Sequence, residues 1–179
     1  LVNEFYNQRR KQLMGVQPNI GHLTLVELEK HFDVHIITQN VDDLHERAGS
    51  KNVLHLHGEL KKVRSSADPD LIFELDGWEL KIGDLCPKGS QLRPHIVWFG
   101  ENVPMIEPAI ELASQADILV VIGTSMAVYP AASLVHYVNN QTPKYYIDPK
   151  AFPIGGINNL QIIQEKAGIG VNLLIEKLL

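Results

Sequence analysis

The stretch VHIITQNVDDLHERAGSKNVLHLH, residues 34–57, indicates the class of fold. Short apolar runs at 34–38 and 53–57 predict two strands, and the segment 41–48 between them predicts a helix. A strand, a helix and a second strand in this order are typical of proteins in which helices connect the strands of a sheet. The stretch therefore predicts an α/β fold.

The same alternation continues along the chain. Strands are expected at 34–38, 53–57, 95–99, 118–124, 144–148 and 160–164. Helices are expected at 2–14, 20–31, 41–48, 105–115, 130–139 and 170–178, with Asn19 as the N-cap of the second. Several of the strands are apolar on both faces, which is typical of a parallel sheet covered by helices. We therefore expect a Rossmann-like, doubly wound parallel sheet.

One region interrupts this alternation. Residues 61–92 are polar and rich in turn residues, and their apolar runs are short. Because the region lies between two expected strands of the sheet, we predict one domain over residues 1–179 with a small inserted module at about 60–93. Trp78 and Leu80 are the candidate anchors of this module.

Composition narrows the class of protein. The net charge of −5 argues against nucleic-acid binding, which needs a basic surface. No apolar run approaches the length of a membrane span, roughly 18 residues. The single cysteine cannot form an internal disulfide, which fits a reducing compartment. We expect a cytoplasmic protein without a nucleic-acid or membrane partner.

Polar side chains follow three of the expected strands. They are Gln39, Asn40 and Asp42 after the first, His57 at the end of the second, and Gly123, Thr124 and Ser125 after the fourth. In open α/β sheets, ligands bind at the carboxyl ends of the strands, and amides and hydroxyls suit ribose and carboxamide groups. The alternative is that Asn40 or Asp42 caps the following helix and that the Gly-Thr-Ser turn is an ordinary strand–helix connection.

Two other features allow more than one interpretation. His55 and His57 lie two residues apart on an expected strand and face the same side, so they could share a metal ion. Zinc needs a third and a fourth ligand, and a hydrogen-bonded or catalytic histidine is the alternative. Gly100, after the expected strand at 95–99, could expose an edge that pairs with an extended peptide, or it could mark a bulge.

Four motifs together resemble the sirtuins, the NAD-dependent protein lysine deacylases, of the bacterial type. The motifs are TQNVDDLHERAG (38–49), HLHGEL (55–60), WFGENVP (98–104) and GTSMAVYPAA (123–132). The resemblance implies an enzyme with NAD as its cofactor and acylated lysine side chains of proteins as its substrates. It transfers the acyl group to ADP-ribose and releases nicotinamide.

The resemblance also implies roles for individual residues. His57 would be the general base towards a ribose hydroxyl, and Asn40 and Asp42 would form the catalytic nicotinamide pocket. The remaining cofactor contacts would come from Gln39 on the nicotinamide ribose and from Gly123, Thr124, Ser125 and Asp148 on the adenosine side. Many sirtuins carry Asn at the position of Asp148, but a carboxylate can also accept hydrogen bonds from ribose hydroxyls.

Substrate contacts follow from the same resemblance. Val97, Phe99, Gly100 and Glu101 would form a wall of the acyl-lysine tunnel, and Val128 and Tyr129 would hold the peptide by strand addition. Tyr6 and Arg9 resemble the Tyr-x-x-Arg pair of sirtuins that prefer acidic acyl groups such as succinyl, because a guanidinium binds a carboxylate with two hydrogen bonds. Two ordinary polar residues on a solvated helix face are the alternative.

The chain departs from the sirtuin pattern in two respects. Cys86 alone stands where most sirtuins carry two pairs of zinc-binding cysteines, so we expect a zinc-free module. The first strand of the family and its Gly-Ala-Gly loop, which grips the NAD phosphates, would lie before Leu1. A chain without them is expected to bind NAD poorly, which leaves an inactive acyl-lysine-binding module as the alternative function. A metal-dependent hydrolase is disfavoured because no ligand set is complete.

Overall fold

A computed structural model describes residues 1–125 and 128–179. The helices are α1 (Val2–Met14), α2 (Ile20–Leu28), α3 (Leu44–Ala48), α4 (Ile106–Ser114), the 3-10 helix η1 (Ala131–His136) and α5 (Ala167–Leu178). The strands are β1 (Ile36–Thr38), β2 (Val53–His55), β3 (Gly58–Ser65), β4 (Ile72–Glu74), β5 (Leu92–Ile96), β6 (Leu119–Ile122), β7 (Lys144–Ile147) and β8 (Leu160–Ile163).

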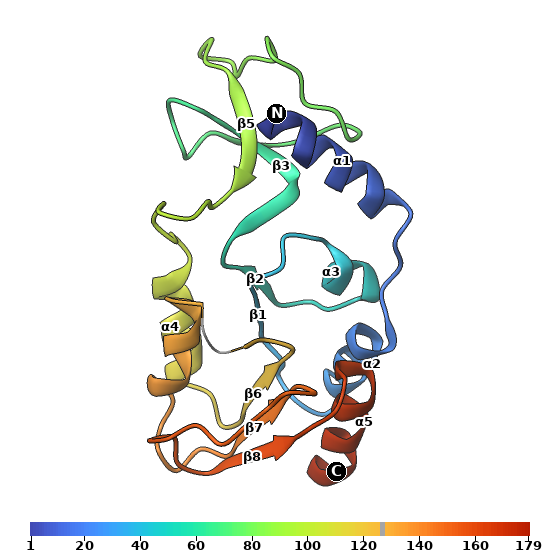
Figure 1. Ribbon diagram of the computed structural model, residues 1–179, viewed down its shortest axis with the longest axis vertical. Coiled ribbons are helices and arrows are strands. Elements are labelled where there is room, and N and C mark those ends of the chain that lie inside the picture. Colours follow the sequence, from blue (N-terminus) through green and yellow to red (C-terminus); the bar gives the residue numbers. More distant parts are fainter. Residues whose placement is uncertain (126–127) are drawn as a thin grey trace.

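The strands form three small sheets. β1 pairs with β2 in parallel, and β6, β7 and β8 form a second parallel sheet in that order. β3 lies between β4 and β5 in an antiparallel sheet. Figure 1 shows β1 and β2 in the middle of the molecule, the antiparallel sheet above them and β6–β8 below. The predicted α/β fold with parallel strands is confirmed.

The main core lies between β6–β8 and the helices α2 and α5. β7 is buried along its whole length, which is why its sequence KYYI is largely apolar on both faces. Ile147, Val171 and Leu174 have no exposed surface. Gly170 allows α5 to approach β7, because a Cβ there would lie 2.2 Å from Ile147 Cγ2. The predicted N-cap of α2 is confirmed, since Asn19 Oδ1 accepts hydrogen bonds from the backbone N–H groups of Gly21 and His22.

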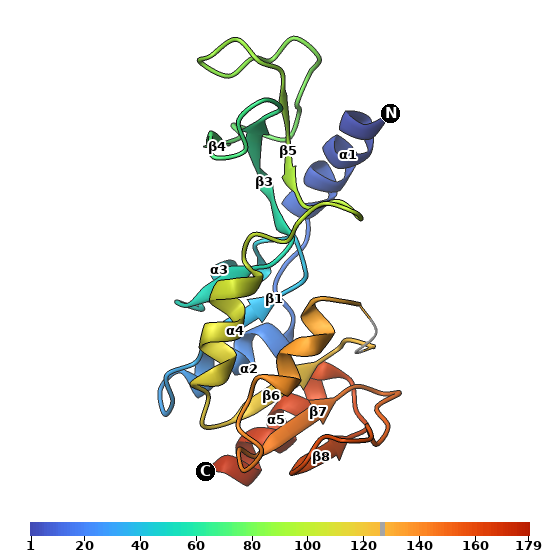
Figure 2. The same ribbon diagram turned by 90° about the vertical axis from the view of Figure 1, so that its left-hand side faces the viewer.

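The inserted segment forms an antiparallel module against which α1 packs (Figure 2). Along β3, buried and more exposed residues largely alternate, as expected of a strand with one covered face. Leu80, a predicted anchor, is 1% exposed, whereas Trp78 is only partly buried. Arg10 of α1 donates from Nε to the Leu60 carbonyl and from Nη1 to the Trp78 carbonyl, so the helix is hydrogen-bonded to the module.

The strand predicted at 95–99 is wrong in its bounds and in its sheet. The strand β5 ends at Ile96 and pairs antiparallel with β3. Residues 97–101 turn away instead, with Gly100 at φ +88° and the backbone N–H of Glu101 bonded to the Trp98 carbonyl. Their apolar side chains suggested a strand, but they belong to a loop. The helix predicted at 41–48 is shorter, and the one predicted at 130–139 is the short η1.

None of the described helices is long and apolar enough to cross a membrane.

Candidate active site

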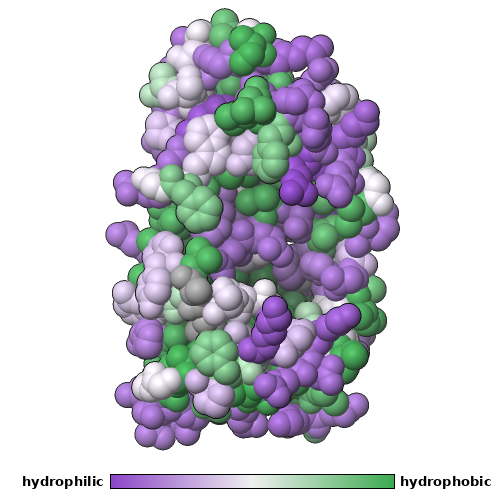
Figure 3. Space-filling view, viewed as in Figure 1, coloured by the Kyte–Doolittle hydropathy of each residue, from purple (hydrophilic) through white to green (hydrophobic). Residues whose placement is uncertain are grey.

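The carboxyl ends of β1, β2 and β6 meet at one place. Gln39 follows β1, His57 follows β2 and Thr124 follows β6. Gln39 Nε2 lies 3.5 Å from Thr124 Oγ1, so the ends of the two parallel sheets come within the reach of one side chain. On the face seen in Figure 1, the surface is hollowed across the middle of the molecule (Figure 3). The predicted convergence of polar strand ends is thus present for these three residues.

His57 is held in a defined orientation. Its Nδ1 lies 3.2 Å from the backbone carbonyl oxygen of Gln39. Because a carbonyl oxygen only accepts, Nδ1 carries the ring proton and Nε2 keeps its lone pair. Among the described residues, Nε2 has no hydrogen-bond partner. The imidazole is therefore arranged as a base at Nε2.

The backbone beside His57 is equally fixed. The His57 carbonyl accepts a hydrogen bond of 2.9 Å from the Val97 N–H, which ties the strand end to the segment after β5. The next residue, Gly58, has φ +82°, and a Cβ there would lie 2.0 Å from the His95 carbonyl oxygen. Only glycine permits this close crossing of the two chains.

Asn40 and Asp42 lie in the turn between β1 and α3. The Asn40 N–H donates to Thr38 Oγ1 at 3.0 Å, and within residues 1–125 and 128–179 the Asn40 side-chain amide has no hydrogen-bond partner. Asp42 Oδ1 accepts the N–H of Leu44, the first residue of α3, at 3.1 Å, which closes an Asx turn before the helix. The N-cap of α3 is Asp43, whose side chain makes no capping hydrogen bond, so the alternative of a plain helix cap is only partly met by Asp42.

His55 belongs to the scaffold. Its Nε2 lies 2.6 Å from Glu46 Oε1, and its Nδ1 lies 3.3 Å from the Asn40 carbonyl oxygen. Both ring nitrogens are therefore engaged, and His55 has no free nitrogen to share an ion with His57. Within residues 1–125 and 128–179, no group of three or more His, Cys, Asp or Glu residues is arranged to hold a metal ion.

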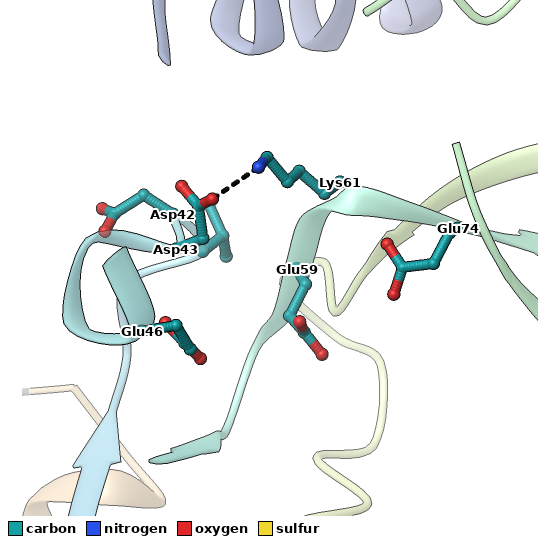
Figure 4. A pocket seen from close by; sticks show the side chains of 7 residues that line it. Asp42, Asp43, Glu46, Glu59, Lys61 and Glu74 are labelled. Atoms are coloured by element: carbon teal, nitrogen blue, oxygen red, sulfur yellow. Dashed lines mark ion pairs between the residues drawn. The ribbon is translucent and has the colours of Figure 1, made fainter. Parts of the chain in front are cut away.

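An acidic cavity of about 180 Å³ lies beside this turn. It is lined by Val41, Asp42, Asp43, Glu46, Glu59, Lys61 and Glu74. Figure 4 shows the carboxylates arriving from the turn before α3, from α3, and from β3 and β4, with Lys61 paired to Asp43 at 2.6 Å. Five carboxylates repel phosphate groups, so this cavity does not suit the pyrophosphate of a dinucleotide.

The Gly-Thr-Ser turn after β6 offers an open cradle. Gly123 has φ +63°, and, apart from its chain neighbours, no heavy atom of the described residues lies within 4 Å of a Cβ placed there, so on this side a ligand can approach the backbone. Tyr146 donates its hydroxyl to the Thr124 carbonyl at 2.8 Å, and burial raises the pKa of this phenol, so it remains a donor. Ser125 is exposed. Asp148 Oδ1 already accepts the Lys150 N–H at 2.7 Å, which leaves its other oxygen for a ligand.

The Glu101 side chain is bound by two arginines. Arg93 donates to both of its carboxylate oxygens, at 2.7 and 3.2 Å, and Arg64 adds a contact of 3.2 Å. The backbone N–H of Trp98 is a further donor to this carboxylate, at 3.0 Å. Hydrogen bonding to Arg93 is the main cause that lowers the pKa of Glu101. The carboxylate therefore fastens the loop to β3 and β5, which carry these two arginines. Phe99, on the same loop, is fully exposed.

Sequence reasoning missed Arg64, Arg93 and Trp98 as residues of this site. They lie in no recognisable spacing, since Arg64 and Glu101 are 37 residues apart. The available signal was two arginines in an acidic chain near a predicted ligand loop. Only the folding of β3 onto β5 brings them together.

Tyr6 and Arg9 lie on α1, next to the module. The Tyr6 hydroxyl is 2.9 Å from Trp98 Nε1, and its ring packs in a core cluster with Leu13 and Ile96. Arg9 is exposed, with its guanidinium carbon 5.3 Å from the centre of the Phe5 ring and Nη1 3.4 Å from Gln12 Oε1. In the described part of the chain, no hydrogen bond joins Tyr6 and Arg9.

Val128 and Tyr129, expected to hold a peptide, are exposed. Met126 and Ala127, inside the motif GTSMAVYPAA, lie outside the described residues.

Comparison with known proteins identifies relatives of this arrangement. A model described as the Sir2 family matches residues 1–130. The chain is 55% identical over 180 residues to a Helicobacter pylori protein named NAD-dependent protein deacylase, covering 99% of this chain and 77% of that protein. A solved Sir2 homolog–NAD complex superposes with a TM-score of 0.84 at 40% identity, over 97% of this chain and 70% of that one. A Sir2 structure bound to acetylated peptide gives 0.76 at 29% identity, over 93% and 73% of the two chains.

Proposed function

The chain belongs to the Sir2 family, and we propose that it is an NAD-dependent protein deacylase that acts on acylated lysine side chains. The relative at 55% identity carries this activity in its name, and the similar solved structures hold NAD or an acetylated peptide. The enzyme would release nicotinamide and transfer the acyl group to ADP-ribose. The protein would form one domain over residues 1–179, with the small module at about 60–93 inserted in it.

The orientation of His57 is the observation that carries this proposal. The Gln39 carbonyl oxygen lies 3.2 Å from His57 Nδ1 and accepts its hydrogen bond. Nε2 is therefore the nitrogen that can accept a proton from a ribose hydroxyl. A histidine with one nitrogen held as a donor and the other directed to the substrate is suited to general-base catalysis. His55, in contrast, has both nitrogens engaged and supports the turn.

The strand ends supply groups that fit NAD. When bound, NAD would supply the ribose C1′ that the acyl oxygen attacks as nicotinamide leaves, and the ribose hydroxyl that carries the acyl group once the lysine amine is released. The open Gly123 turn and the exposed Ser125 suit the adenosine side, where Thr124 would lie against the cofactor and the second carboxylate oxygen of Asp148 would accept a hydrogen bond from a ribose hydroxyl. Gln39 would contact the nicotinamide ribose, and Asn40 and Asp42 would hold the carboxamide, for which the unused Asn40 amide offers both a donor and an acceptor.

The substrate peptide would lie along the loop after β5. Val97 is anchored to the His57 carbonyl, and Phe99 and Gly100 beside it are exposed, so an acyl-lysine could reach the imidazole past this loop. Val128 and Tyr129, on the segment before η1, are exposed and would pair with the peptide backbone.

For the acyl group, we propose that Tyr6 and Arg9 favour acidic chains such as succinyl. The exposed Arg9 guanidinium can bind a carboxylate with two hydrogen bonds. Arg9→Met should lower desuccinylation far more than deacetylation, and Lys11→Met on the same helix is the matched control. Equal losses of the two activities in Arg9→Met would refute this assignment.

The activity itself is tested by nicotinamide release from NAD in the presence and absence of an acetyl-lysine peptide. Release should depend on the peptide and should fall by roughly a thousandfold or more in His57→Ala, because the base is lost. His31→Ala, which removes an exposed histidine, should leave release unchanged. Peptide binding without any release in the wild type would favour the inactive binding module.

A further inference from the structure

Trp98 donates its only polar hydrogen to the hydroxyl of Tyr6. The distance from Trp98 Nε1 to the Tyr6 oxygen is 2.9 Å, and the two rings stack with centres 6.4 Å apart at 22°. An indole N–H can only donate, so the Tyr6 oxygen must accept. The hydroxyl proton of Tyr6 therefore points to another acceptor. The described residues provide no such acceptor, and Tyr6 is only half-buried, so this proton can be donated to solvent or to a bound group that displaces it.

The indole cannot easily leave this position. The guanidinium carbon of Arg93 lies 3.6 Å from the centre of the Trp98 ring. Arg93 is itself fixed by two hydrogen bonds to Glu101, and the same carboxylate accepts the backbone N–H of Trp98. The tryptophan is thus held by a cation over its ring and by the Tyr6 hydroxyl at its N–H.

We propose that Trp98 is a positioning residue that determines acyl specificity, by fixing the Tyr6 hydroxyl as a hydrogen-bond donor to an anionic acyl chain. The inference rests on the proposed role of Tyr6 and Arg9 and extends it to a residue outside that pair. A carboxylate only accepts hydrogen bonds, so it gains from a fixed donor. The methyl group of an acetyl chain gains nothing. Trp98 accordingly favours acidic over neutral acyl groups without contacting them.

The test compares affinities for two peptides that differ only in carrying succinyl-lysine or acetyl-lysine, measured by fluorescence anisotropy. Trp98→Phe keeps an aromatic ring on Arg93 but removes the N–H. We expect it to lower the succinyl-to-acetyl affinity ratio roughly tenfold, as for the loss of one oriented hydrogen bond to a charged group. Trp78→Phe, in the module, is the control and should keep the ratio.

A double-mutant cycle separates positioning from general damage to the loop. If Trp98 acts through the Tyr6 hydroxyl, Trp98→Phe should not change the ratio further in a Tyr6→Phe background. Additive effects, or equal losses of affinity for both peptides, would overturn the inference. A wild type that prefers succinyl while Trp98→Phe keeps that preference overturns this inference alone. A wild type without the preference overturns it together with the proposed role of Tyr6 and Arg9.

Discussion

Gly58, the residue after the proposed base, shows how one position controls the site. Its Cβ would meet the His95 carbonyl oxygen at 2.0 Å, and its φ is +82°. Because the obstacle is backbone, it cannot move aside as a flexible side chain would. The crossing of β3 and β5 beside His57 therefore depends on this glycine.

Gly58→Ala should lower the free energy of unfolding by about 3 kcal/mol or more, because clash and backbone strain add. The control is Gly83→Ala, where φ is +100° but no heavy atom lies within 4 Å of the new Cβ. This control should lose only about 1–2 kcal/mol, from strain alone. Urea unfolding measures the free energy of unfolding of both variants. Equal losses in Gly58→Ala and Gly83→Ala would show that the close crossing is not needed.

Asn7 joins α1 to the module through a pair of backbone hydrogen bonds. Its Nδ2 donates to the Leu80 carbonyl at 3.1 Å, and its Oδ1 accepts the Leu80 N–H at 2.9 Å. Asn7→Ala leaves both buried groups unpaired and should cost about 3 kcal/mol in urea unfolding. Gln8→Ala, at the exposed neighbouring position, should change stability by less than about 0.5 kcal/mol. A similar small change in Asn7→Ala would contradict the docking of α1.

At the scale of elements, α2 and α3 meet through two histidines. The rings of His22 and His45 lie 4.7 Å apart, and His22 Nδ1 accepts the Asn19 N–H at the start of α2. Burial is the main cause that lowers the pKa of each, and for His45 the neighbouring His22 adds to it. Asp42 and Glu46 face the pair and oppose part of this effect. Folding therefore favours the neutral form of both rings.

Because folding lowers the pKa of both histidines, the two neutral rings contribute to the free energy of unfolding. This contribution is complete above the ordinary histidine pKa of 6.5. As the pH falls below that value, the unfolded chain binds protons first and stability is lost. Urea unfolding from about pH 7.5 to about pH 5.5 should show this decrease. His22→Gln, which keeps an acceptor for the cap, should flatten it, whereas the exposed His31→Gln should not. An unchanged slope in His22→Gln would refute the role of this pair.

The module is expected to fold without zinc. Its single cysteine, Cys86, is buried, and hydrogen bonding from the Ser65 hydroxyl is the main cause that lowers the pKa of its thiol. Metal analysis of the purified protein should find no stoichiometric zinc, and EDTA should leave the Tm unchanged. One zinc per chain, lost together with thermal stability in EDTA, would contradict this expectation.

Apolar sequence patterns predict a strand well where the apolar residues are there because helices cover the strand. The strands at 144–148 and 160–164 were found because β7 and its neighbour are apolar where they are covered by helices. The strand at 95–99 was misplaced because Trp98 is apolar for another reason, its contact with Arg93 and Tyr6. The docking of α1 could not be predicted, since Arg10 bonds to carbonyls 50 and 68 residues away.

At the scale of the whole molecule, the candidate site lies where the ends of two parallel sheets face each other below the module (Figure 1). Gln39 and Thr124 meet there although they are 85 residues apart. The residue types at these strand ends were predictable from the rule for open α/β sheets, and the role of His57 came from the resemblance. Its tautomer was not predictable, because it depends on the distance to one backbone carbonyl.

In the proposed reaction, the acyl group leaves lysine for ADP-ribose and His57 acts as the base. Mass spectrometry of the products formed from NAD and an acetyl-lysine peptide tests this most directly. We predict that nicotinamide, free lysine peptide and acetylated ADP-ribose form in equal amounts in the wild type, and that acetylated ADP-ribose is lost in His57→Ala. Free acetate formed without consumption of NAD, or an undiminished yield in His57→Ala, would contradict the account.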